Sequence, residues 1–324
     1  MRQQHHKDHN GLCIKSDPFL KRLATHYALR STHHTALITQ HGFTLVELMI
    51  AIFISMIIIT ATYAAYISQQ RSFTSQDQVT EMNSTSKIAL DTISNDIRET
   101  GFGLPSDLTT IQRSAGCPGI NGYLQSINIT DRTSGTDEIT ILGGFRLVGY
   151  ISADVSMGST ILTLSSTGNL NITDRSYISI AGLGFAIISG ISGNTLTLHD
   201  STPADRRYPP GVPVYLVENI TYRVVNRRLY KIRRLNSGVC STNSDVDVIA
   251  ENIDDFQVAT VDTNSDGTTD RIRINILART PRPDLNFQGQ GNPPATIENR
   301  KHASTNDSFR RRWWQTEVDL RNQI

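Results

Sequence analysis

The stretch HGFTLVELMIAIFISMIIITATYAAYI, residues 41–67, joins a long apolar run to a single acidic residue near its start. As a helix, the part from Phe43 to Ile67 would extend about 37 Å, which is enough to cross a bilayer. A carboxylate in such a run is costly unless it is paired, protonated or at the interface, so Glu47 marks a functional position. The stretch therefore predicts a membrane-spanning helix whose acidic residue has a partner.

The residues before this run are basic. Residues 1–42 hold six Lys or Arg and two acidic residues, and their removal leaves 25 basic and 28 acidic residues in the chain. Because the basic side of an apolar span stays in the cytoplasm, we expect a single-pass protein with its C-terminal head outside the cytoplasm. The slightly acidic head does not favour nucleic acid as a partner.

The position of the glycine distinguishes this segment from an ordinary signal peptide. A signal peptide has a shorter apolar core, and its small-residue cleavage site follows the core. Here Gly42 precedes the apolar run. Cleavage at this point would remove a leader, residues 1–42, and leave the apolar helix as the new N-terminus.

The segment GFTLVELMIAIFIS, residues 42–55, resembles the processing site and N-terminal helix of type IV prepilins and type II secretion pseudopilins. In that superfamily a membrane peptidase, prepilin peptidase, cuts after the glycine and methylates the new N-terminus. The resemblance implies a cut between Gly42 and Phe43 and an N-methylated Phe43. Glu47 would then be an assembly residue that pairs with the free N-terminal amine of a neighbouring subunit.

The chain beyond the apolar run predicts an α+β fold, with a long N-terminal helix packed on a β-rich head, as in pilins. Apolar residues recur at three- and four-residue steps from Val79 to Ile97, and Gly101 and Gly103 follow. We expect four segments. They are the leader (1–42), a transmembrane or filament-core half of the helix (43–67), an amphipathic half (68–100) and the head (101–324).

Short runs of β-branched residues between turn residues predict the strands of the head. The runs are DEITIL, TILTLSS, SYISIAG, NTLTLHD, PVYLVENITYRV and RIRINILART. A stretch near 281–308 is rich in Pro, Gly, Asn and Ser and should be loop-rich. The ending RRRWWQTEVDL alternates in a way that indicates a closing strand with one buried face.

Three segments of the head resemble minor pilins of the PilW type. They are VENITYRV (217–224), the run from AENIDDF to ILART (250–280), and RRRWWQTEVDLRN (310–322). The resemblance implies a low-copy subunit that primes assembly with other minor pilins and the major pilin. Such a subunit would lie in inner-membrane lipid with its head in the periplasm, and then in the pilus, at or near the tip.

The stretch DTNSDGTTD, residues 262–270, places oxygen ligands at alternate positions around a glycine, as calcium loops do. The candidate ligands are Asp262, Asn264, Asp266, Thr268 and Asp270. A full EF-hand has a bidentate glutamate where this chain has Arg273. The alternative is a hairpin turn of Asp, Asn and Gly between two strands. A bound Ca²⁺ would be structural.

Two of the three cysteines, Cys117 and Cys240, lie in the expected head. An exported head permits a disulfide, so this pair is a disulfide candidate, and two unpaired thiols are the alternative.

Motifs that carry catalysis are missing from the sequence, which contains no HExxH, GxSxG, P-loop or CxxC. We therefore expect no enzyme. Two other functions compete with a minor pilin. One is a minor pseudopilin of type II secretion. The other is a calcium-dependent adhesin or DNA-binding head that uses the pilin-type helix as an anchor.

Overall fold

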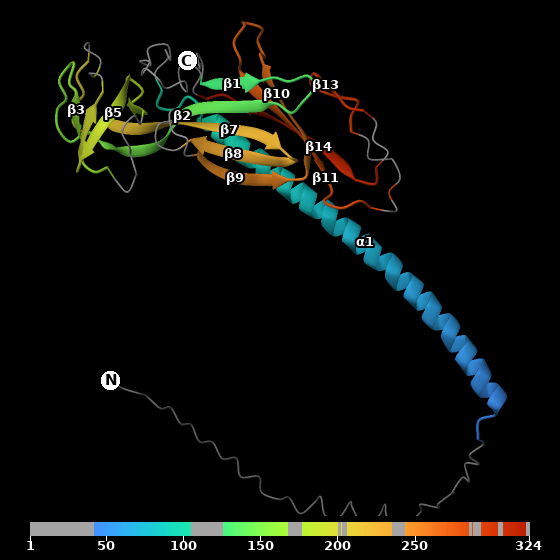
Figure 1. Ribbon diagram of the computed structural model, residues 1–324. Coiled ribbons are helices and arrows are strands. Elements are labelled where there is room, and N and C mark those ends of the chain that lie inside the picture. The colour runs from blue at the N-terminus through green and yellow to red at the C-terminus, as the bar shows by residue number, and fades with distance from the viewer. Residues whose placement is uncertain are drawn as a thin grey trace, which may run out of the picture. The chain divides into compact units, whose positions relative to one another are not determined.

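The computed structural model describes residues 42–104, 126–167, 177–199, 202, 206–234, 244–284, 287, 293–303 and 307–321. The chain divides into two units, Met1–Ala65 and Tyr66–Ile324, and each is described by itself. The expected α+β class is confirmed, because one helix, α1 (Leu45–Glu99), precedes a head of antiparallel strands (Figure 1).

The second half of α1 buries one stripe of side chains in the head. The buried residues recur at three- and four-residue steps, which places them on one face of the helix. They are Met82, Ser86, Ala89, Leu90, Ile93, Ser94 and Ile97. The helix ends where Gly101 adopts a left-handed φ of 77° and donates its N–H to the carbonyl of Leu142 at 2.9 Å.

Nine strands form the larger sheet of the head. They are β1 (Ile127–Thr130), β2 (Glu138–Tyr150), β3 (Ile161–Thr163), β4 (Tyr177–Ile180), β5 (Gly184–Ser192), β6 (Thr195–Leu198), β7 (Pro213–Val225), β8 (Arg228–Arg234) and β9 (Ser244–Glu251). The order is β1-β2-β7-β4-β5-β6-β3, and β8 pairs with both β7 and β9. The long strand β7 is the centre of this sheet, since it pairs with β2, β4 and β8.

A second sheet holds three strands in the order β10-β11-β14, namely β10 (Ile253–Val261), β11 (Arg271–Arg279) and β14 (Arg311–Asp319). The predicted alternation of the last strand is present, with Val318 buried and its neighbours Glu317 and Asp319 exposed. The loop-rich stretch near 281–308 also contains a short hairpin of β12 (Thr296–Ile297) and β13 (Arg300–Lys301). Each predicted strand run contains an observed strand.

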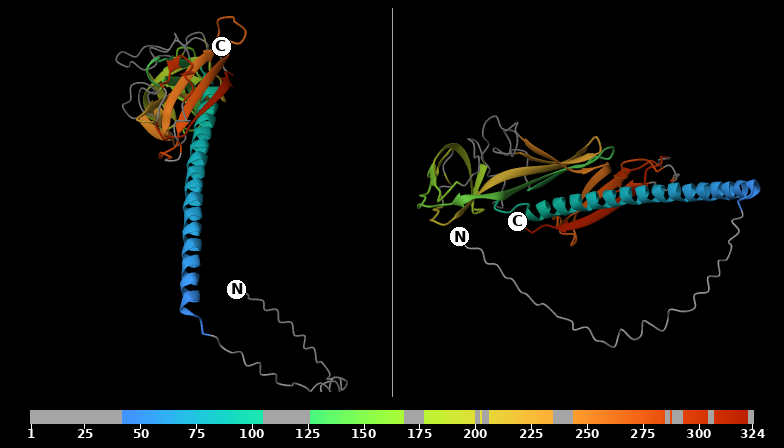
Figure 2. Two further views of the ribbon diagram at one scale, coloured as in Figure 1. Left: turned by 90° about the vertical axis from the view of Figure 1, so that its right-hand side faces the viewer. Right: turned by 90° about the horizontal axis from the view of Figure 1, so that it is seen from below.

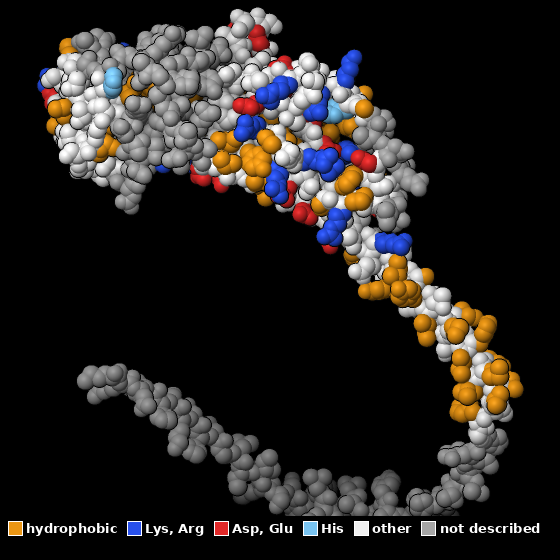
Figure 3. Space-filling model, viewed as in Figure 1, with side chains coloured by type: hydrophobic (Ala, Val, Ile, Leu, Met, Phe, Trp, Pro, Cys, Tyr) orange, Lys and Arg blue, Asp and Glu red, His pale blue; other side chains and the backbone are white. Residues whose placement is uncertain are grey.

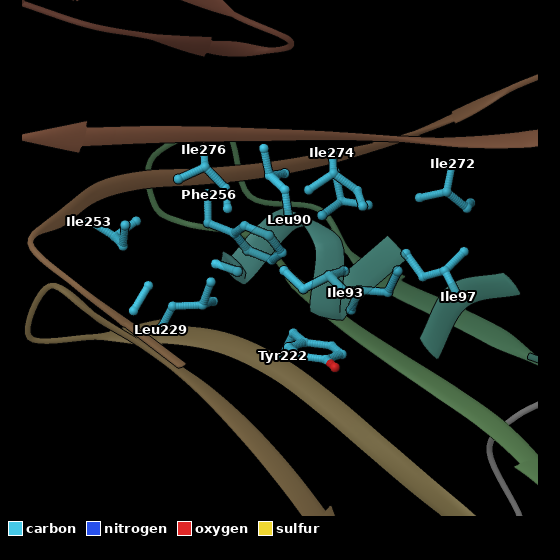
Figure 4. Close-up of a cluster of buried hydrophobic side chains, with 14 of the residues drawn as sticks. Leu90, Ile93, Ile97, Tyr222, Leu229, Ile253, Phe256, Ile272, Ile274 and Ile276 are labelled. Carbon is cyan, nitrogen blue, oxygen red and sulfur yellow. The ribbon is translucent and has the colours of Figure 1, made fainter. Parts of the chain in front are cut away.

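The main core forms where the stripe of α1 meets both sheets. Ile93 of the helix lies near Tyr222 of the larger sheet and near Phe256 and Ile274 of the smaller one, and Ile97 lies on the side of Ile272 (Figure 4). The teal part of α1 accordingly runs along the strands of the head in both views of Figure 2. A separate apolar cluster, which includes Leu162, Ile178 and Leu196, lies among strands β2 to β7.

One glycine allows the end of α1 to close against β2. A Cβ atom on Gly144 would lie 2.8 Å from Cβ of Tyr215. The Gly144 N–H also donates to the carbonyl of Phe102 at 2.7 Å, just after the helix. A side chain at this position would therefore separate the turn from the sheet.

Candidate processing and assembly site

A reciprocal hydrogen-bond pair forms the N-terminal end of α1. The Thr44 N–H donates to Oε2 of Glu47 at 2.9 Å, and the Glu47 N–H donates to Oγ1 of Thr44 at 3.2 Å. This is a capping box, in which the residue before the helix and the third helical residue satisfy each other's free N–H groups. Thr44 thus explains why the helix begins at Leu45.

The same geometry leaves part of the Glu47 carboxylate open. Among the described residues, the side-chain hydrogen bonds of Glu47 all involve Thr44, and those to the carboxylate use Oε2. Its other oxygen, Oε1, can accept a hydrogen bond from a group outside this chain. Among the described residues, the predicted cleavage point is also open, because Phe43 is 90% exposed and no heavy atom lies within 4 Å of the place that a Cβ on Gly42 would take.

The first half of α1 has the chemistry of a membrane span. Among the described residues, one helix is long enough and apolar enough to cross a membrane, and this helix is α1. Every side chain from Gly42 to Ala65 is exposed, and Figure 3 shows the apolar ones in orange along this part of the helix. The hydroxyls of Thr60 and Thr62 donate to the carbonyls of Met56 and Ile58, both at 2.8 Å, so these polar groups are satisfied within the helix.

Comparison with known families identifies the class of this N-terminus. Residues 38–63 match the family model described as the prokaryotic N-terminal methylation motif. The N-terminus therefore carries a prepilin-type motif at the start of a long apolar helix, and this motif implies processing by prepilin peptidase. This combination is consistent with the type IV pilin superfamily, which includes pilin-like and pseudopilin proteins. Comparisons with curated proteins and with solved structures give no significant match.

The candidate calcium loop forms an exposed turn between β10 and β11. Asp262 accepts hydrogen bonds from the N–H groups of Ser265 at 2.6 Å and Gly267 at 2.8 Å. Asp266 accepts one from the Thr268 N–H at 2.8 Å, and these hydrogen bonds from Thr268 lower the pKa of Asp266. These carboxylates thus accept hydrogen bonds from the backbone of their own loop, which is the arrangement expected for the alternative interpretation, a hairpin turn.

The remaining carboxylate of the loop is held in the same way. Asp270 accepts a hydrogen bond from the Thr263 N–H at 2.8 Å, and hydrogen bonds from Thr263 lower its pKa. Throughout the described residues, no group of three or more His, Cys, Asp or Glu side chains is placed to hold a metal ion. Calcium binding stays a prediction, and it would require the loop carboxylates to exchange backbone partners for the ion.

The disulfide candidate cannot be placed, since Cys117 and Cys240 both lie outside the described residues.

Two neighbouring arginines at the start of β14 are paired with carboxylates. Arg311 contacts Asp254 at 2.7 Å and Asp307 at 2.6 Å, and Arg310 contacts Asp284 at 2.8 Å. The hydrogen bonds from Arg311 lower the pKa of Asp307. These carboxylates neutralise the charge of Arg310 and Arg311, so these two described arginines do not offer free positive charge to a nucleic-acid backbone.

Sequence reasoning missed a polar cluster that ties α1 to the larger sheet. Asp96 of the helix accepts a hydrogen bond from the Tyr222 hydroxyl and pairs with Lys231 at 2.5 Å. Burial, followed by the charge of Asp96, raises the pKa of Tyr222. No sequence signal joins residues so far apart, although the polar position of Asp96 beside a buried stripe was visible.

Proposed function

We propose that this chain is a minor pilin of the PilW type that primes assembly of a type IV pilus with other minor pilins. The observation that carries the proposal is the methylation motif at the start of one long helix, with Glu47 at its exposed N-terminal end. The likeness of the head segments to PilW-type minor pilins supports the finer assignment. The chain would lie in the inner membrane before assembly and near the pilus tip afterwards.

Cleavage after Gly42 would create a cationic partner for the Oε1 atom of Glu47. The new amine on Phe43 of a neighbouring subunit is cationic and would lie at a similar depth in the membrane. Oε1 of Glu47 would accept from that amine while Oε2 stays bonded to Thr44. Because an unpaired carboxylate is costly in the bilayer, this charge pair would stabilise the docked position of the next subunit and set its axial position.

The test is made in the protein's own cells with chromosomal variants of Glu47. We expect Glu47→Gln and Glu47→Ala to be processed normally but to be lost from sheared pili, and surface pili to decline as in a deletion strain. Asp91→Asn, which changes an exposed acidic residue on the same helix, should behave as wild type. Normal amounts of the Glu47 variants in pili would contradict the assembly role.

A minor pseudopilin of type II secretion is the second candidate, because the same motif precedes those proteins. The two functions differ in what a deletion strain loses. Loss of surface pili with normal protein secretion supports the minor pilin. Loss of secreted proteins with normal pili would instead assign the chain to the secretion system.

A further inference from the structure

Strand β9 is a free edge of the larger sheet. Among the described strands, β9 pairs with β8 alone. The backbone N–H and C=O groups on its other side are therefore available to an added strand. Val246 and Val248 on this strand are 49% and 45% exposed, which is high for valines in a sheet.

The flank of α1 beside β9 adds a second wall. Glu81 and Thr85 of the helix line a cavity of about 180 Å³ together with the end of β9. Met82 and Ile249 contribute its apolar surface, and Glu81 and Glu251 contribute carboxylates. Such a cavity suits a long side chain with an apolar stem and a cationic end.

Positive charge near this cavity is already committed. Arg279 also lines it, but its guanidinium lies 3.5 Å from Asp254 and stacks over the ring of Phe309. Arg228 pairs with Glu251 at 3.0 Å, and both of these side chains are largely exposed, so this pair is weak.

Acidic side chains alternate along the free edge. Asp247 stands directly opposite Lys231, which pairs with Asp96 of α1, so Asp247 points toward the helix side of the sheet. Asp245 shares that face and lies directly opposite Arg233, and among the described residues neither aspartate has an ion pair within 4 Å or a side-chain hydrogen bond. Figure 3 shows acidic side chains, with Lys and Arg among them, along the lower edge of the head, where Figure 1 places β9 and the adjoining part of α1.

We propose that β9 and the adjoining flank of α1 form a docking groove for an extended segment of a different chain that carries Lys or Arg at alternate positions. The segment adds a strand to β9. Its basic side chains face Asp245 and Asp247, one of them enters the cavity between Glu81 and Glu251, and its other side chains cover the exposed valines.

A second copy of this chain does not fit the groove. Two β9 strands joined with the same face upward would bring Asp247 against Asp247, and like charges directly opposite each other are destabilising. Among the other described edge strands of the two large sheets, β1, β3 and β10 carry no Lys or Arg, and β14 carries Glu317 and Asp319 on one face. None of them offers an alternating basic face. The aspartates therefore exclude copies of this chain and favour a basic partner.

The test uses the full chain extracted in detergent and a fluorescent peptide, acetyl-TKVKTKVT-amide. We expect saturable binding that weakens as salt is raised, and no binding of acetyl-TEVETEVT-amide. The double variant Asp245→Lys/Asp247→Lys should weaken binding about tenfold or more, because like charges then face each other. Asp91→Lys, on α1 but outside the cavity, should leave binding unchanged.

Two further measurements keep the result interpretable. A peptide with N-methylated amides along one edge should not bind, since it cannot pair with a strand. The milder variant Asp245→Asn/Asp247→Asn should bind with intermediate affinity if the fold is intact by circular dichroism. Equal binding of the N-methylated peptide or of the Asp245→Lys/Asp247→Lys variant would overturn the proposal, as would self-association of the chain that these variants abolish.

Discussion

At the scale of single residues, Asp137 is a buried carboxylate that joins the two sheets. Its Oδ1 accepts from the Arg132 N–H and its Oδ2 from the Val258 N–H, both at 2.8 Å. Burial raises its pKa, the two backbone hydrogen bonds oppose that shift, and the charges of Asp131 and Asp255 add to it. Two backbone donors thus depend on one side chain.

We expect Asp137→Asn to lower the free energy of unfolding by about 1–3 kcal/mol, because an amide can accept from only one of the two N–H groups. Urea unfolding of the detergent-extracted chain, followed by circular dichroism, measures the change. Asp91→Asn, at an exposed position, is the matched control and should change little. Equal stability of Asp137→Asn and wild type would show that the two donors find other partners.

The raised pKa of Asp137 also has a consequence for pH. Because the folded state holds this proton more tightly than the unfolded state, the contribution of Asp137 to stability falls as the pH rises from 3.8 through the raised value. The Asp137→Asn variant should lack this slope. A pH series of the same unfolding measurement compares the two proteins, and parallel curves would contradict the assignment.

The predicted calcium loop also depends on single residues. If the loop at 262–270 binds Ca²⁺, added calcium should raise the melting temperature of the chain, and a chelator should reverse the rise. Asp266→Ala should remove this response, whereas Asp91→Ala should keep it. A melting temperature that does not respond to calcium in the wild-type chain would leave the loop as a hairpin turn.

Sequence alone predicted some of these residues and not others. Gly42, Phe43 and Glu47 form a local motif, and the spacing of Thr44 and Glu47 already has the pattern of a capping box. The partners of Asp137 could not be predicted, because Val258 lies far along the chain and meets it only once the strands have paired.

At the scale of elements, α1 has two surfaces of different purpose. In the head its buried stripe contacts both sheets, and Ile93 is fully buried. On another face of the same helix Ile88 is 58% exposed. Because Ile93 and Ile88 have the same side chain, comparing them separates the effect of burial on stability from the effect of side-chain type.

We expect Ile93→Ala to lower the free energy of unfolding by about 2–5 kcal/mol, since it removes buried methyl groups and leaves a cavity. Ile88→Ala should change it by no more than about 0.5 kcal/mol. Urea unfolding of the two variants gives the comparison. Similar losses in both would mean that the buried stripe of α1 is not the main contact between helix and head.

The extent of the helix and the predicted strands follow from local patterns, and the structure bears them out. The order of the strands in the sheets could not be predicted from these local patterns. Strand β2 pairs with β7 across a long segment of chain, with register shifts near Gly143 and Leu147. Periodicity indicates which face of a strand is buried but not which strand lies beside it.

At the scale of the whole molecule, one continuous helix belongs to both units of the chain. Its first half exposes an apolar surface, and its second half is part of the core of the head. The same element can therefore serve as a membrane anchor and as a structural element of the head. Removal of residues 1–42 would turn the start of this helix into the N-terminus of the protein.

The most direct test of this account is the mass and N-terminal sequence of the protein extracted from the membranes of its own cells. We expect a chain that begins at N-methyl-Phe43, which would establish cleavage after Gly42 and the position of Glu47 as the fifth residue. A chain that still carries residues 1–42 would contradict processing, and the protein would then be a simple anchored ectodomain.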